Sequence, residues 1–451
     1  MRPQHVLPGC WSKVVFLLQI PIGPQFRGRL SNNVIRLPYE ILGSVAVPQL
    51  GNVKDFPALA LTDTASRMKK TLPKKSTYRM YVCGITPYDA THLGHAATYL
   101  TFDLINRYLR ASGAQVSYVQ NITDIDDPLL ERANRDGIEW SELAHQQIDL
   151  FRSDMVNLRV IPPAHYIGAV EAIPLVINAI ADLRQQSSIY GVDSDFYFSN
   201  KKDENFGSRS HLTDQQMLDV FAERGGDPSR TGKVDPLDCL VWMSQRVNEP
   251  GWDSDLGKGR PGWHIECTAI ALEYLDPSDL EETLIDIQGG GSDLIFPHHE
   301  MCAAQAHVMT GKELAFSYVH TGMIGLDGEK MSKSKGNLVF VSRLIASGVD
   351  PMSIRWALMS DHYRSDRMWS EEVLGQAQEQ TSRLRQALSM DVCAPTRELI
   401  TSIISALSND LDTPLVITQL NSWSEETLSG SNGGNKEELI TALDALLGIA
   451  L

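Results

Sequence analysis

Residues 83–95 read C-G-I-T-P-Y-D-A-T-H-L-G-H and combine residue types that bind metal ions and phosphate groups. Cys83 offers a thiolate, which is a ligand that soft metal ions prefer. His92 and His95 lie on either side of Gly94, which lets a ligand come close to the backbone because glycine has no Cβ. This pairing suits an enzyme that holds a thiol and also handles a nucleotide phosphate.

A second segment, 330–337, reads K-M-S-K-S-K-G-N and supplies positive charge. Clustered lysines usually form a solvated surface run, but here Met331 and two serines interrupt the charge and an apolar segment follows. Glycines on both sides predict a mobile loop. Lys330 and Lys333 on such a loop can close over a polyphosphate as pyrophosphate leaves, and removing one such donor typically costs on the order of 10²–10³ in rate.

The sequence pattern also predicts the elements that position the first segment. The β-forming residues 78–82 end at the Cys-Gly pair and predict a strand that runs into a tight turn. Apolar residues recur at helical spacing from Leu93 to a stop near Gly113. The two histidines therefore lie at a strand-to-helix junction, where free N–H groups and the helix dipole favour anions. An isolated H-x-G-H is more often a pair of exposed histidines that cap a helix, and the lysine-rich segment favours the phosphate site.

Two residues far along the chain complete a candidate metal site with Cys83. Cys267 ends the string R-P-G-W-H-I-E-C, and His298 lies in D-L-I-F-P-H-H-E. Scattered cysteines are most often small buried apolar residues, but both residues flank a glycine- or proline-bounded turn, as expected where loops converge at the ends of parallel strands. Two thiolates and one imidazole leave a tetrahedral zinc ion one ligand short, which is the pattern of a catalytic zinc.

An open position on zinc gives a physical reason for selecting cysteine. A pocket that uses shape alone separates near-isosteres such as cysteine and serine by only about 1–3 kcal/mol. Zinc lowers the pKa of a bound thiol and prefers sulfur to a hydroxyl. Selection by the metal would therefore need no separate editing domain.

The composition indicates a protein of several lobes in a reducing compartment, and we expect it to be cytoplasmic. The chain has 451 residues, which fit two or three lobes, and its six cysteines lack the paired spacing of a disulfide framework. Forty basic against 56 acidic residues leave a net charge of −16 and no general electrostatic footprint for a polyanion. No apolar run approaches the ~20 residues of a membrane helix, so no membrane partner is expected. Residues 1–40 are expected to be a poorly ordered extension or the product of a start assigned too early.

Together, H-L-G-H and K-M-S-K-S resemble the HIGH and KMSKS elements of the class I aminoacyl-tRNA synthetase catalytic domain. The resemblance implies an α/β fold of the HUP type, in which ATP binds on a Rossmann-like doubly wound parallel sheet and Mg²⁺ accompanies ATP. The predicted organisation is a first catalytic half (41–189), an inserted subdomain (190–250), a second catalytic half with the lysine-rich loop (251–340) and a C-terminal helical bundle (341–451) with a last helix at 436–447.

The chain also resembles cysteinyl-tRNA synthetase and, more closely, the ATP-dependent ligases of mycothiol biosynthesis that join cysteine to the amine of glucosaminyl-inositol. This resemblance covers roughly residues 45–451. Ile85-Thr86-Pro87 follows the Cys-Gly pair, where the synthetase usually has Pro-Thr-Val, and Ala97 stands where the synthetase usually has arginine. Further ligase-like strings are N-I-T-D-I-D-D-P at 121–128, G-M-I-G at 322–325, H-Y-R-S-D-R-M-W-S at 362–370 and, the most discriminating, E-R-G-G-D-P at 223–228.

The resemblance implies roles for individual residues. It implies zinc at Cys83, Cys267 and His298, and stabilisation of phosphate charge by His92, His95, Lys330 and Lys333. It implies contacts to a cysteinyl adenylate from Cys83, Gly84, Ile85, Thr86, Thr98, Asn121, Ile122, Thr123, Trp263, Gly291, Ser292, Asp293, Ile324, Lys330 and Lys333. The acceptor is expected near the loop of Glu223, Arg224, Gly225, Gly226, Asp227 and Pro228. The residue pattern alone is equally compatible with packing roles for Thr98 and Ile324.

The resemblance thus implies one zinc ion per chain, with L-cysteine, ATP and glucosaminyl-inositol as substrates, and we expect a monomer. Cysteinyl-tRNA synthetase is the alternative activity, although the C-terminal region lacks the clustered basic and aromatic residues of a typical tRNA-binding region. A non-catalytic module derived from a synthetase is a third reading, which the intact motifs disfavour. Asp89, Asp126 and Asp293 are candidate general bases because they lie close to these motifs.

Cys302 marks a departure from the synthetase, which usually has a glutamate near the metal at this position. On a helix, residues i and i+4 share a face, so the Cys302 thiol could reach a metal ion bound by His298. A fourth protein thiolate would close the site and exclude the sulfur of the substrate. We therefore expect Cys302 to lie outside the set of metal ligands when cysteine is bound.

Overall fold

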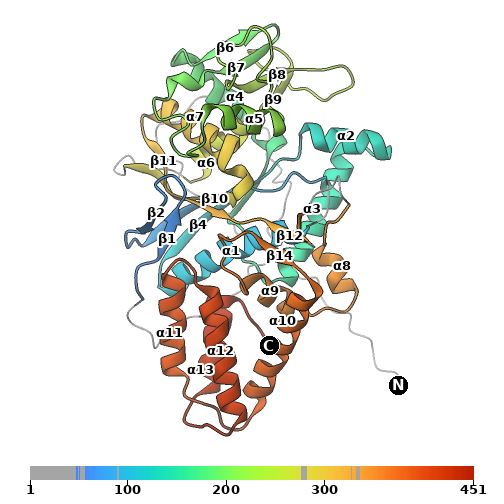
Figure 1. The fold of residues 1–451 in the computed structure, drawn as a ribbon. Coiled ribbons are helices and arrows are strands. Elements are labelled where there is room, and N and C mark those ends of the chain that lie inside the picture. The colour runs from blue at the N-terminus through green and yellow to red at the C-terminus, as the bar shows by residue number, and fades with distance from the viewer. Residues whose placement is uncertain are drawn as a thin grey trace, which may run out of the picture. The chain divides into compact units, whose positions relative to one another are not determined.

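A five-stranded parallel sheet lies at the centre of the fold (Figure 1). Its strand order is β11 (Glu313–Thr321), β10 (Thr283–Gly291), β3 (Thr77–Val82), β4 (Gln115–Ile122) and β5 (His165–Gly168), and every neighbouring pair is parallel. The chain builds outward from β3 in one direction and later returns to the other side of β3. Doubly wound sheets bind ligands at such a reversal, in the crevice beyond the carboxyl ends of the strands. The predicted doubly wound parallel sheet is therefore confirmed.

Helices cover both faces of this sheet (Figure 1). They are α1 (Leu93–Ala111), α4 (Ala169–Gln185), α6 (Trp263–Tyr274) and α7 (Glu300–Thr310). Successive side chains of a strand point to opposite faces, and in β3 this places Met80 and Val82 in the core around α1, whereas Tyr81 packs with α6 and α7. Cys83 continues the alternation and also packs in the α6–α7 layer. The register of β3 thus directs the thiol of Cys83 toward α6 and α7.

The segment between α4 and α6 forms an antiparallel sheet of its own. Its order is β6 (Ile189–Val192), β7 (Asp195–Phe198), β8 (Cys239–Ser244) and β9 (Gly259–Pro261), and the connection from β7 to β8 contains η1 (Asn200–Lys202) and α5 (Asp214–Glu223). Phe198, Val241 and Trp242 of this sheet pack against apolar residues of α4 and α6. The boundaries of the predicted subdomain stay a prediction, but the sheet is joined to the catalytic layer through a shared core.

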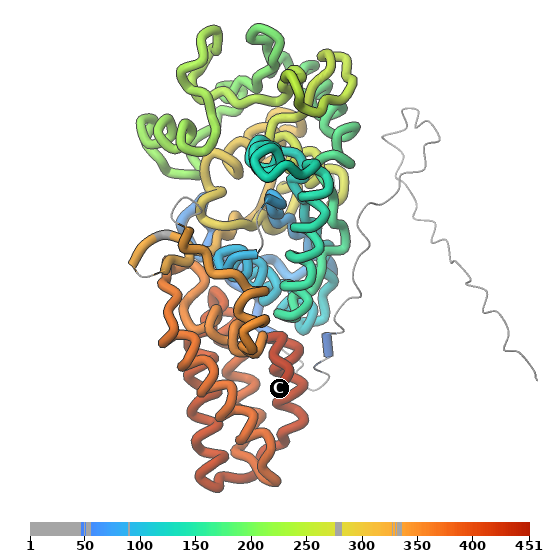
Figure 2. Tube along the Cα trace, turned by 90° about the vertical axis from the view of Figure 1, so that its right-hand side faces the viewer, coloured from blue at the N-terminus to red at the C-terminus, as the bar shows by residue number. Residues whose placement is uncertain are grey.

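Helices dominate the chain after residue 340. They are α8 (Val341–Ala346), α9 (Pro351–Met359), α10 (Glu371–Ser389), α11 (Arg397–Ser408), α12 (Thr413–Leu428) and α13 (Lys436–Leu447). Figure 2 shows the long helices α10 to α13 running side by side in orange and red. Ile400, Ile403 and Leu407 recur at helical spacing on α11 and are buried, as expected of an apolar stripe that faces a core. The last helix has the bounds that the sequence predicts.

Smaller elements lie around these layers. They are the antiparallel pair β1 (Ala60–Asp63) and β2 (Met68–Thr71), the three-stranded sheet of β13 (Glu329–Lys330), β12 (Ile324–Leu326) and β14 (Arg367–Trp369), the helices α2 (Asp127–Asp136) and α3 (Trp140–Asn157), and the turns η2 (Ser292–Leu294) and η3 (Ile295–His299). The turn η3 leads directly into α7, and α2 begins just after β4. The turn η3 and the helix α2 therefore both start at the carboxyl edge of the central sheet.

The structure is a computed structural model that describes residues 47–48, 50, 56–88, 91–275, 282–326, 328–331 and 336–451. The predicted extension (1–40), Asp89 and Lys333 lie outside these residues. Of the helices in the described ranges, none is both long and apolar enough to pass through a bilayer.

A buried ion network joins α1 to the C-terminal helices. Asp103 of α1 accepts hydrogen bonds from Arg107 Nε at 2.8 Å and from Arg355 of α9. Arg355 also donates to the carbonyl oxygens of Leu158 at 2.7 Å and Leu447 at 2.6 Å. Burial acts to raise the pKa of Asp103, but the two guanidinium groups outweigh burial and hold that pKa below its ordinary value. The network fastens α1, which begins next to His92, to α9 and to the end of α13.

Replacing Asp103 with asparagine should lower the free energy of unfolding by roughly 3–5 kcal/mol, because two buried guanidinium groups lose their counter-charge. Folding lowers the pKa of Asp103, so its contribution is present at neutral pH and is lost as pH falls through the folded pKa. Chemical denaturation at neutral and acidic pH measures both effects. Asp136→Asn is the control, since Asp136 pairs with Arg132 and Arg135 at the end of α2. Equal stability of the two variants would contradict the role of the network.

Candidate functional site

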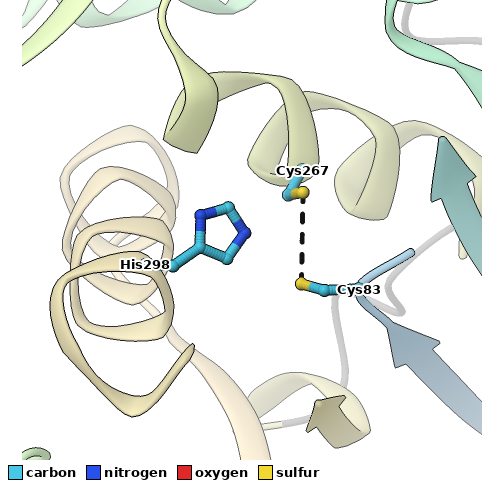
Figure 3. Close-up of side chains that lie close together, drawn as sticks. All are labelled: Cys83, Cys267 and His298. Carbon is cyan, nitrogen blue, oxygen red and sulfur yellow. Dashed lines mark hydrogen bonds between the residues drawn. The ribbon is translucent and has the colours of Figure 1, made fainter. Parts of the chain in front are cut away.

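Three metal-binding side chains converge in a buried cluster beyond the carboxyl end of β3. The Sγ atoms of Cys83 and Cys267 lie 4.0 Å apart, and donor atoms of Cys83, Cys267 and His298 all lie within 4.8 Å of one another. Figure 3 shows the two sulfur atoms facing each other, with the His298 ring beside them. All three residues are buried. The fold thus brings the three predicted ligands into one place.

Each of these residues comes from a different element. Cys83 directly follows β3, and His298 lies in the turn η3 that leads into α7. Cys267 lies inside α6, in its second turn. The sequence places Cys267 beside a turn, and the structure moves it into a helix because Gly262 already caps the start of α6. A helical position holds the thiol more rigidly than a loop position.

The three residues share charge within the cluster. Burial acts to raise the pKa of the Cys267 thiol, but the Cys83 thiol and His298 outweigh burial and lower that pKa well below its ordinary value. Burial acts to lower the pKa of His298, and the sulfurs of Cys302 and Cys267 outweigh it and raise that pKa well above its ordinary value. Two sulfurs and an imidazole form a donor set that borderline metal ions prefer. Three protein ligands leave one position open on a tetrahedral ion.

Further histidines orient the cluster. His264 Nδ1 lies 2.9 Å from His298 Nδ1, so the other ring nitrogen of His298 is left for a metal ion. Cys83 Sγ lies 3.2 Å from His299 Nε2, and His299 Nδ1 lies 2.7 Å from His320 Nε2. Groups that contact a metal ligand from behind fix its direction and its basicity. His264, which lies in the same string as Cys267, and His299, which follows His298, therefore support the cluster.

Cys302 lies next to His298 but outside the group of three donors. Its Sγ atom lies 3.8 Å from His298 Nε2, and the thiol donates to the carbonyl oxygen of His264 at 3.3 Å. This carbonyl gives the S–H group an acceptor other than a metal ion. The arrangement is in keeping with the expectation that Cys302 is no ligand, which stays a prediction for the cysteine-bound protein.

Glu300 fastens the start of α7 to the segment that precedes α5. One carboxylate oxygen accepts from Gly207 N at 3.0 Å and from Arg209 Nη1 at 3.1 Å, and the other accepts from Ser210 N at 2.8 Å. The carboxylate is buried with both oxygens partnered, which avoids the cost of an uncompensated charge. Because Glu300 follows His298 closely, these bonds also fix the backbone that carries the imidazole.

The H-x-G-H stretch forms the N-terminal cap of α1. His92 Nδ1 accepts the N–H groups of Gly94 at 3.1 Å and His95 at 3.4 Å, and the two imidazole rings stack with centroids 3.8 Å apart. A Cβ at position 94 would lie 2.9 Å from the His92 ring, so the stack requires glycine. The predicted strand-to-helix junction is confirmed. His92 accepts two of the N–H groups at the start of α1. An anion bound at this helix end would therefore interact with the His95 ring, the remaining N–H groups and the dipole of α1.

Gly84 and Asn121 hold the loop after β3 against β4. Gly84 N donates to Asn121 Oδ1 at 2.8 Å, and Asn121 Nδ2 donates to Thr123 Oγ1 at 3.2 Å. A Cβ on Gly84 would lie 1.6 Å from the carbonyl oxygen of Asn121, so only glycine permits this approach. Asn121 therefore fixes the position of this loop without lining the cleft itself.

A cleft of about 930 Å³ adjoins the cluster. The predicted residues that line it are Cys83, Gly84, Ile85, Thr86, His92, His95, Thr98, Thr123, Trp263, Gly291, Asp293, Glu223, Arg224, Gly225, Gly226 and Asp227. Those that do not line it are Asn121, Ile122, Ser292, Ile324 and Pro228, together with the cluster residues Cys267 and His298. Ile122 and Ile324 are buried in hydrophobic cores, so for Ile324 the structure matches the packing alternative.

The lysine-rich loop meets the same cleft at its two described ends. Lys330 pairs through its backbone with Gly325 in the β12–β13 hairpin. Met331 and Leu338 line the cleft on either side of the loop. Lys333 lies outside the described residues, so its contribution stays a prediction.

The loop 223–228 reaches the cluster side of the cleft through Arg224. The Arg224 guanidinium donates to the carbonyl oxygens of Asp293 and Phe296, which precede His298. Asp227 accepts from Lys233 Nζ at 2.9 Å and from the Tyr197 hydroxyl. The loop is thereby tied to both the antiparallel sheet and the segment that carries the imidazole.

The cleft is also lined by residues for which the sequence predicted no individual role. They include Tyr88, Asp127, Glu131, Tyr197, Phe221, Arg230, Met243, Arg260, His264, Glu266 and Met323. For Arg260, His264 and Glu266, closeness to Cys267 in one string was a usable signal. Tyr197 and Arg230 gave no such signal, because they reach the cleft only through the fold of the antiparallel sheet.

Comparison with known proteins gives the chain a family. Residues 69–379 match the family described as tRNA synthetases class I (C) catalytic domain. A protein of Thermomonospora curvata named L-cysteine:1D-myo-inositol 2-amino-2-deoxy-alpha-D-glucopyranoside ligase is 52% identical over 411 residues, which cover 90% of this chain and 97% of that protein. A protein of Kribbella flavida with the same name is 53% identical over 399 residues, which cover 87% of this chain and 96% of that protein.

Solved structures agree on the fold. Mycobacterium tuberculosis methionyl-tRNA synthetase in complex with methionyl-adenylate aligns with a TM-score of 0.59 at 16% identity, over 82% of this chain and 90% of that chain. A second structure of that synthetase bound by methionyl-adenylate gives a TM-score of 0.56 at 15% identity, over 82% of this chain and 92% of that chain. At such identities the likeness concerns the fold alone. The family match and the ligase relatives, in contrast, span most of the sequence, and this chain belongs to the class I (C) tRNA synthetase catalytic-domain family and, within it, to the group of the L-cysteine:1D-myo-inositol 2-amino-2-deoxy-alpha-D-glucopyranoside ligases.

Proposed function

We propose that this protein is an ATP-dependent ligase of mycothiol biosynthesis, which joins L-cysteine to the amine of glucosaminyl-inositol through a cysteinyl adenylate. The observation that carries the proposal is that the buried cluster of two cysteines and a histidine adjoins the same cleft as the H-x-G-H histidines. One cleft can therefore hold a thiol and a phosphate together. The names of relatives that share half of the sequence support glucosaminyl-inositol, in place of tRNA, as the acceptor.

We propose that Cys83, Cys267 and His298 hold one zinc ion per chain. Their donor set and their mutual distances fit a tetrahedral ion with three protein ligands. When bound, zinc would supply an open position that favours a thiolate over the hydroxyl of serine. The chain itself buries the ligands, orients the His298 ring through His264, and holds the start of α7 through Glu300.

The phosphate end of the cleft is assigned to the histidines and the lysine-rich loop. ATP binds with Mg²⁺, and the carboxylate of cysteine attacks the α-phosphorus while the bond to pyrophosphate breaks. His92 and His95 meet the α-phosphate at the start of α1, where the helix dipole favours negative charge. Lys330 and Lys333 stabilise the charge that develops on pyrophosphate.

The remaining walls of the cleft hold the adenylate and the acceptor. Residues 84–86 and Thr123 form the wall after β3 and β4, and Trp263 and Asp293 form the wall beside the cluster. These side chains are assigned to the cysteinyl adenylate. The loop 223–228 is assigned to the acceptor, because it lines the same cleft from the inserted sheet.

Changing Cys267 to serine should remove most of the bound zinc and with it the selection of cysteine. We expect the unaltered protein to hold about one zinc ion per chain and to prefer cysteine to serine by more than the roughly 200-fold that shape alone provides. Elemental analysis and pyrophosphate exchange with either amino acid measure these quantities. Cys302→Ser is the matched control and should keep both. Metal-stripped protein with undiminished discrimination would contradict the zinc assignment.

Cysteine-dependent ATP–pyrophosphate exchange should fall by on the order of 10²–10³ in the variant Lys330→Ala, because a positioned cation is lost from the leaving group. Lys69→Ala is the control, since the Lys69 side chain is exposed on β2 and bonds Asn409 at 2.6 Å. Circular dichroism checks that both variants fold. Exchange that proceeds without cysteine, or that ignores Lys330→Ala, would rule out this mechanism.

The acceptor is tested by offering labelled cysteine and ATP with either glucosaminyl-inositol or tRNA. We expect label to appear in the sugar conjugate, with AMP released in equal amount, and no label on tRNA. Mass spectrometry of the conjugate identifies the amide. Transfer to tRNA in place of the sugar would replace the proposed function with cysteinyl-tRNA synthesis.

A further inference from the structure

Transfer of cysteine to an amine needs a group that accepts a proton close to the reacting carbonyl. The acceptor attacks as the neutral amine, after it has released one proton to water. As the nitrogen lone pair forms the C–N bond, the bond from the carbonyl carbon to the adenylate oxygen breaks, and AMP leaves with that electron pair. The nitrogen must then lose a second proton, because an amide nitrogen carries one hydrogen where the amine carried two.

The buried cluster limits where this base can lie. The carbonyl carbon of cysteine is separated from its sulfur by only two carbon atoms, so a sulfur held at Cys83, Cys267 and His298 keeps the carbonyl near the cluster. The base must therefore line the cleft and lie within electrostatic reach of the cluster. Among the described residues, the carboxylates that line the cleft are Asp126, Asp127, Glu131, Glu223, Asp227, Glu266 and Asp293.

Ion pairs or exposure to solvent exclude four of these carboxylates as the base. Asp127 pairs with Arg260, and Asp227 pairs with Lys233 at 2.9 Å. In each pair the cation lies against a carboxylate oxygen, which is then not open to a proton from the acceptor nitrogen. Glu131 and Glu223 are exposed to solvent. None of these four carboxylates is both free of an ion pair and protected from solvent.

Two further carboxylates are removed by their position. Glu266 is only 1% exposed, whereas Asp126 is half-buried, so the Glu266 carboxylate is the less accessible of the two to an acceptor nitrogen. Asp293 folds back over the end of β10, where its Oδ1 atom would lie 2.4 Å from a Cβ on Gly291. The proposed function assigns Asp293 to the adenylate. Asp126 is the carboxylate that is left among the described residues.

Asp126 has the placement that the proton transfer requires. It follows β4 at the carboxyl edge of the central sheet and caps α2, with Oδ1 accepting the N–H of Asp127 at 2.8 Å. This bond fixes the carboxylate through one oxygen and leaves Oδ2 for a proton. The side chain is half-buried and lines the cleft together with Thr86 and Trp263.

Charged groups from four elements act on Asp126. They are Asp127 of α2, Arg260 of β9, His298 of η3 and Glu266 of α6. The interaction with His298 places Asp126 within electrostatic reach of the cluster. Burial raises the pKa of Asp126 to about 6. The hydrogen bond from the Asp127 N–H, Arg260 and His298 oppose this rise, and the charge of the Asp127 carboxylate adds to it. A general base is most effective when its pKa lies near the working pH.

We infer that Asp126 is the general base of the acceptor step and takes the second proton from the amine nitrogen as the amide forms. The inference rests on the proposed ligase function and assigns a residue to its second half-reaction. Asp126 has no part in adenylate formation, because the carboxylate of cysteine attacks ATP without losing a proton to the protein.

The test separates the two half-reactions in the variant Asp126→Asn. Asparagine caps a helix as well as aspartate does, so α2 keeps its start. Transfer from preformed, enzyme-bound cysteinyl adenylate to glucosaminyl-inositol, measured in a single turnover, should slow by on the order of 10²–10⁴. Cysteine-dependent ATP–pyrophosphate exchange should be unchanged. Asp136→Asn is the control at the other end of α2, outside the cleft lining, and should retain both reactions.

The pH profile of the single turnover gives a second readout. The acceptor amine must be neutral in every variant, so all profiles fall as pH falls. The wild-type profile should steepen below about pH 6, where Asp126 gains a proton. The Asp126→Asn profile should lack this extra steepening, which a merely structural loss would leave in place.

Three outcomes would overturn the inference. Transfer by Asp126→Asn at the wild-type rate and with the wild-type profile would exclude Asp126 as the base. An equal loss of exchange and transfer would show that Asp126 supports substrate binding or folding. Wild-type protein that makes the adenylate but never transfers cysteine to the sugar would overturn the proposed function, and the role of Asp126 with it.

Discussion

The cluster of Cys83, Cys267 and His298 depends on one constraint, which is that three distant segments must pack on the same face of the central sheet. Alternation along β3 sends Cys83 to that face, and α6 and α7 cover it. Burying two thiols and an imidazole together is costly unless charge is shared among them. The lowered pKa of Cys267 and the raised pKa of His298 are the sign of this sharing. A divalent cation bound by these three residues would balance the charge of the buried thiolates in the same way.

The strand β3 also separates the two ends of the proposed reaction. Tyr81 near its end and Cys83 just after it send their side chains toward the α6–α7 layer, where the sulfur atoms lie. The loop that follows leads to His92 and to the start of α1 on the other layer. Cysteine bound between these ends would have its thiol at the cluster and its carboxylate toward the phosphate. Selection and activation can thus proceed within one cleft, on either side of a single strand end.

The inserted antiparallel sheet is coupled to this centre by direct contacts. Gly207, Arg209 and Ser210 bond Glu300 at the start of α7, and Arg224 donates to the backbone that precedes His298. Because the loop 223–228 and the imidazole share these supports, the wall that we assign to the acceptor is built on the same backbone as the cluster of Cys83, Cys267 and His298. This shared support gives the inserted segment a defined position at the cleft.

Local patterns in the sequence determined the strand before Cys83, the junction at His92 and the last helix, since strand and helix periods and caps are encoded by neighbouring residues. The family resemblance identified Cys267 and His298 as partners of Cys83, although no spacing along the chain links them. Only the tertiary structure decided that these three meet, that Cys267 lies inside α6, and that Tyr197 and Arg230 reach the cleft. Of the candidate bases that lie in the described residues, Asp126 and Asp293, the placement in the cleft favours Asp126 for the role that we infer. The physical reason is that the strand order and the packing of helices on the sheet depend on contacts between distant segments, which no local pattern contains.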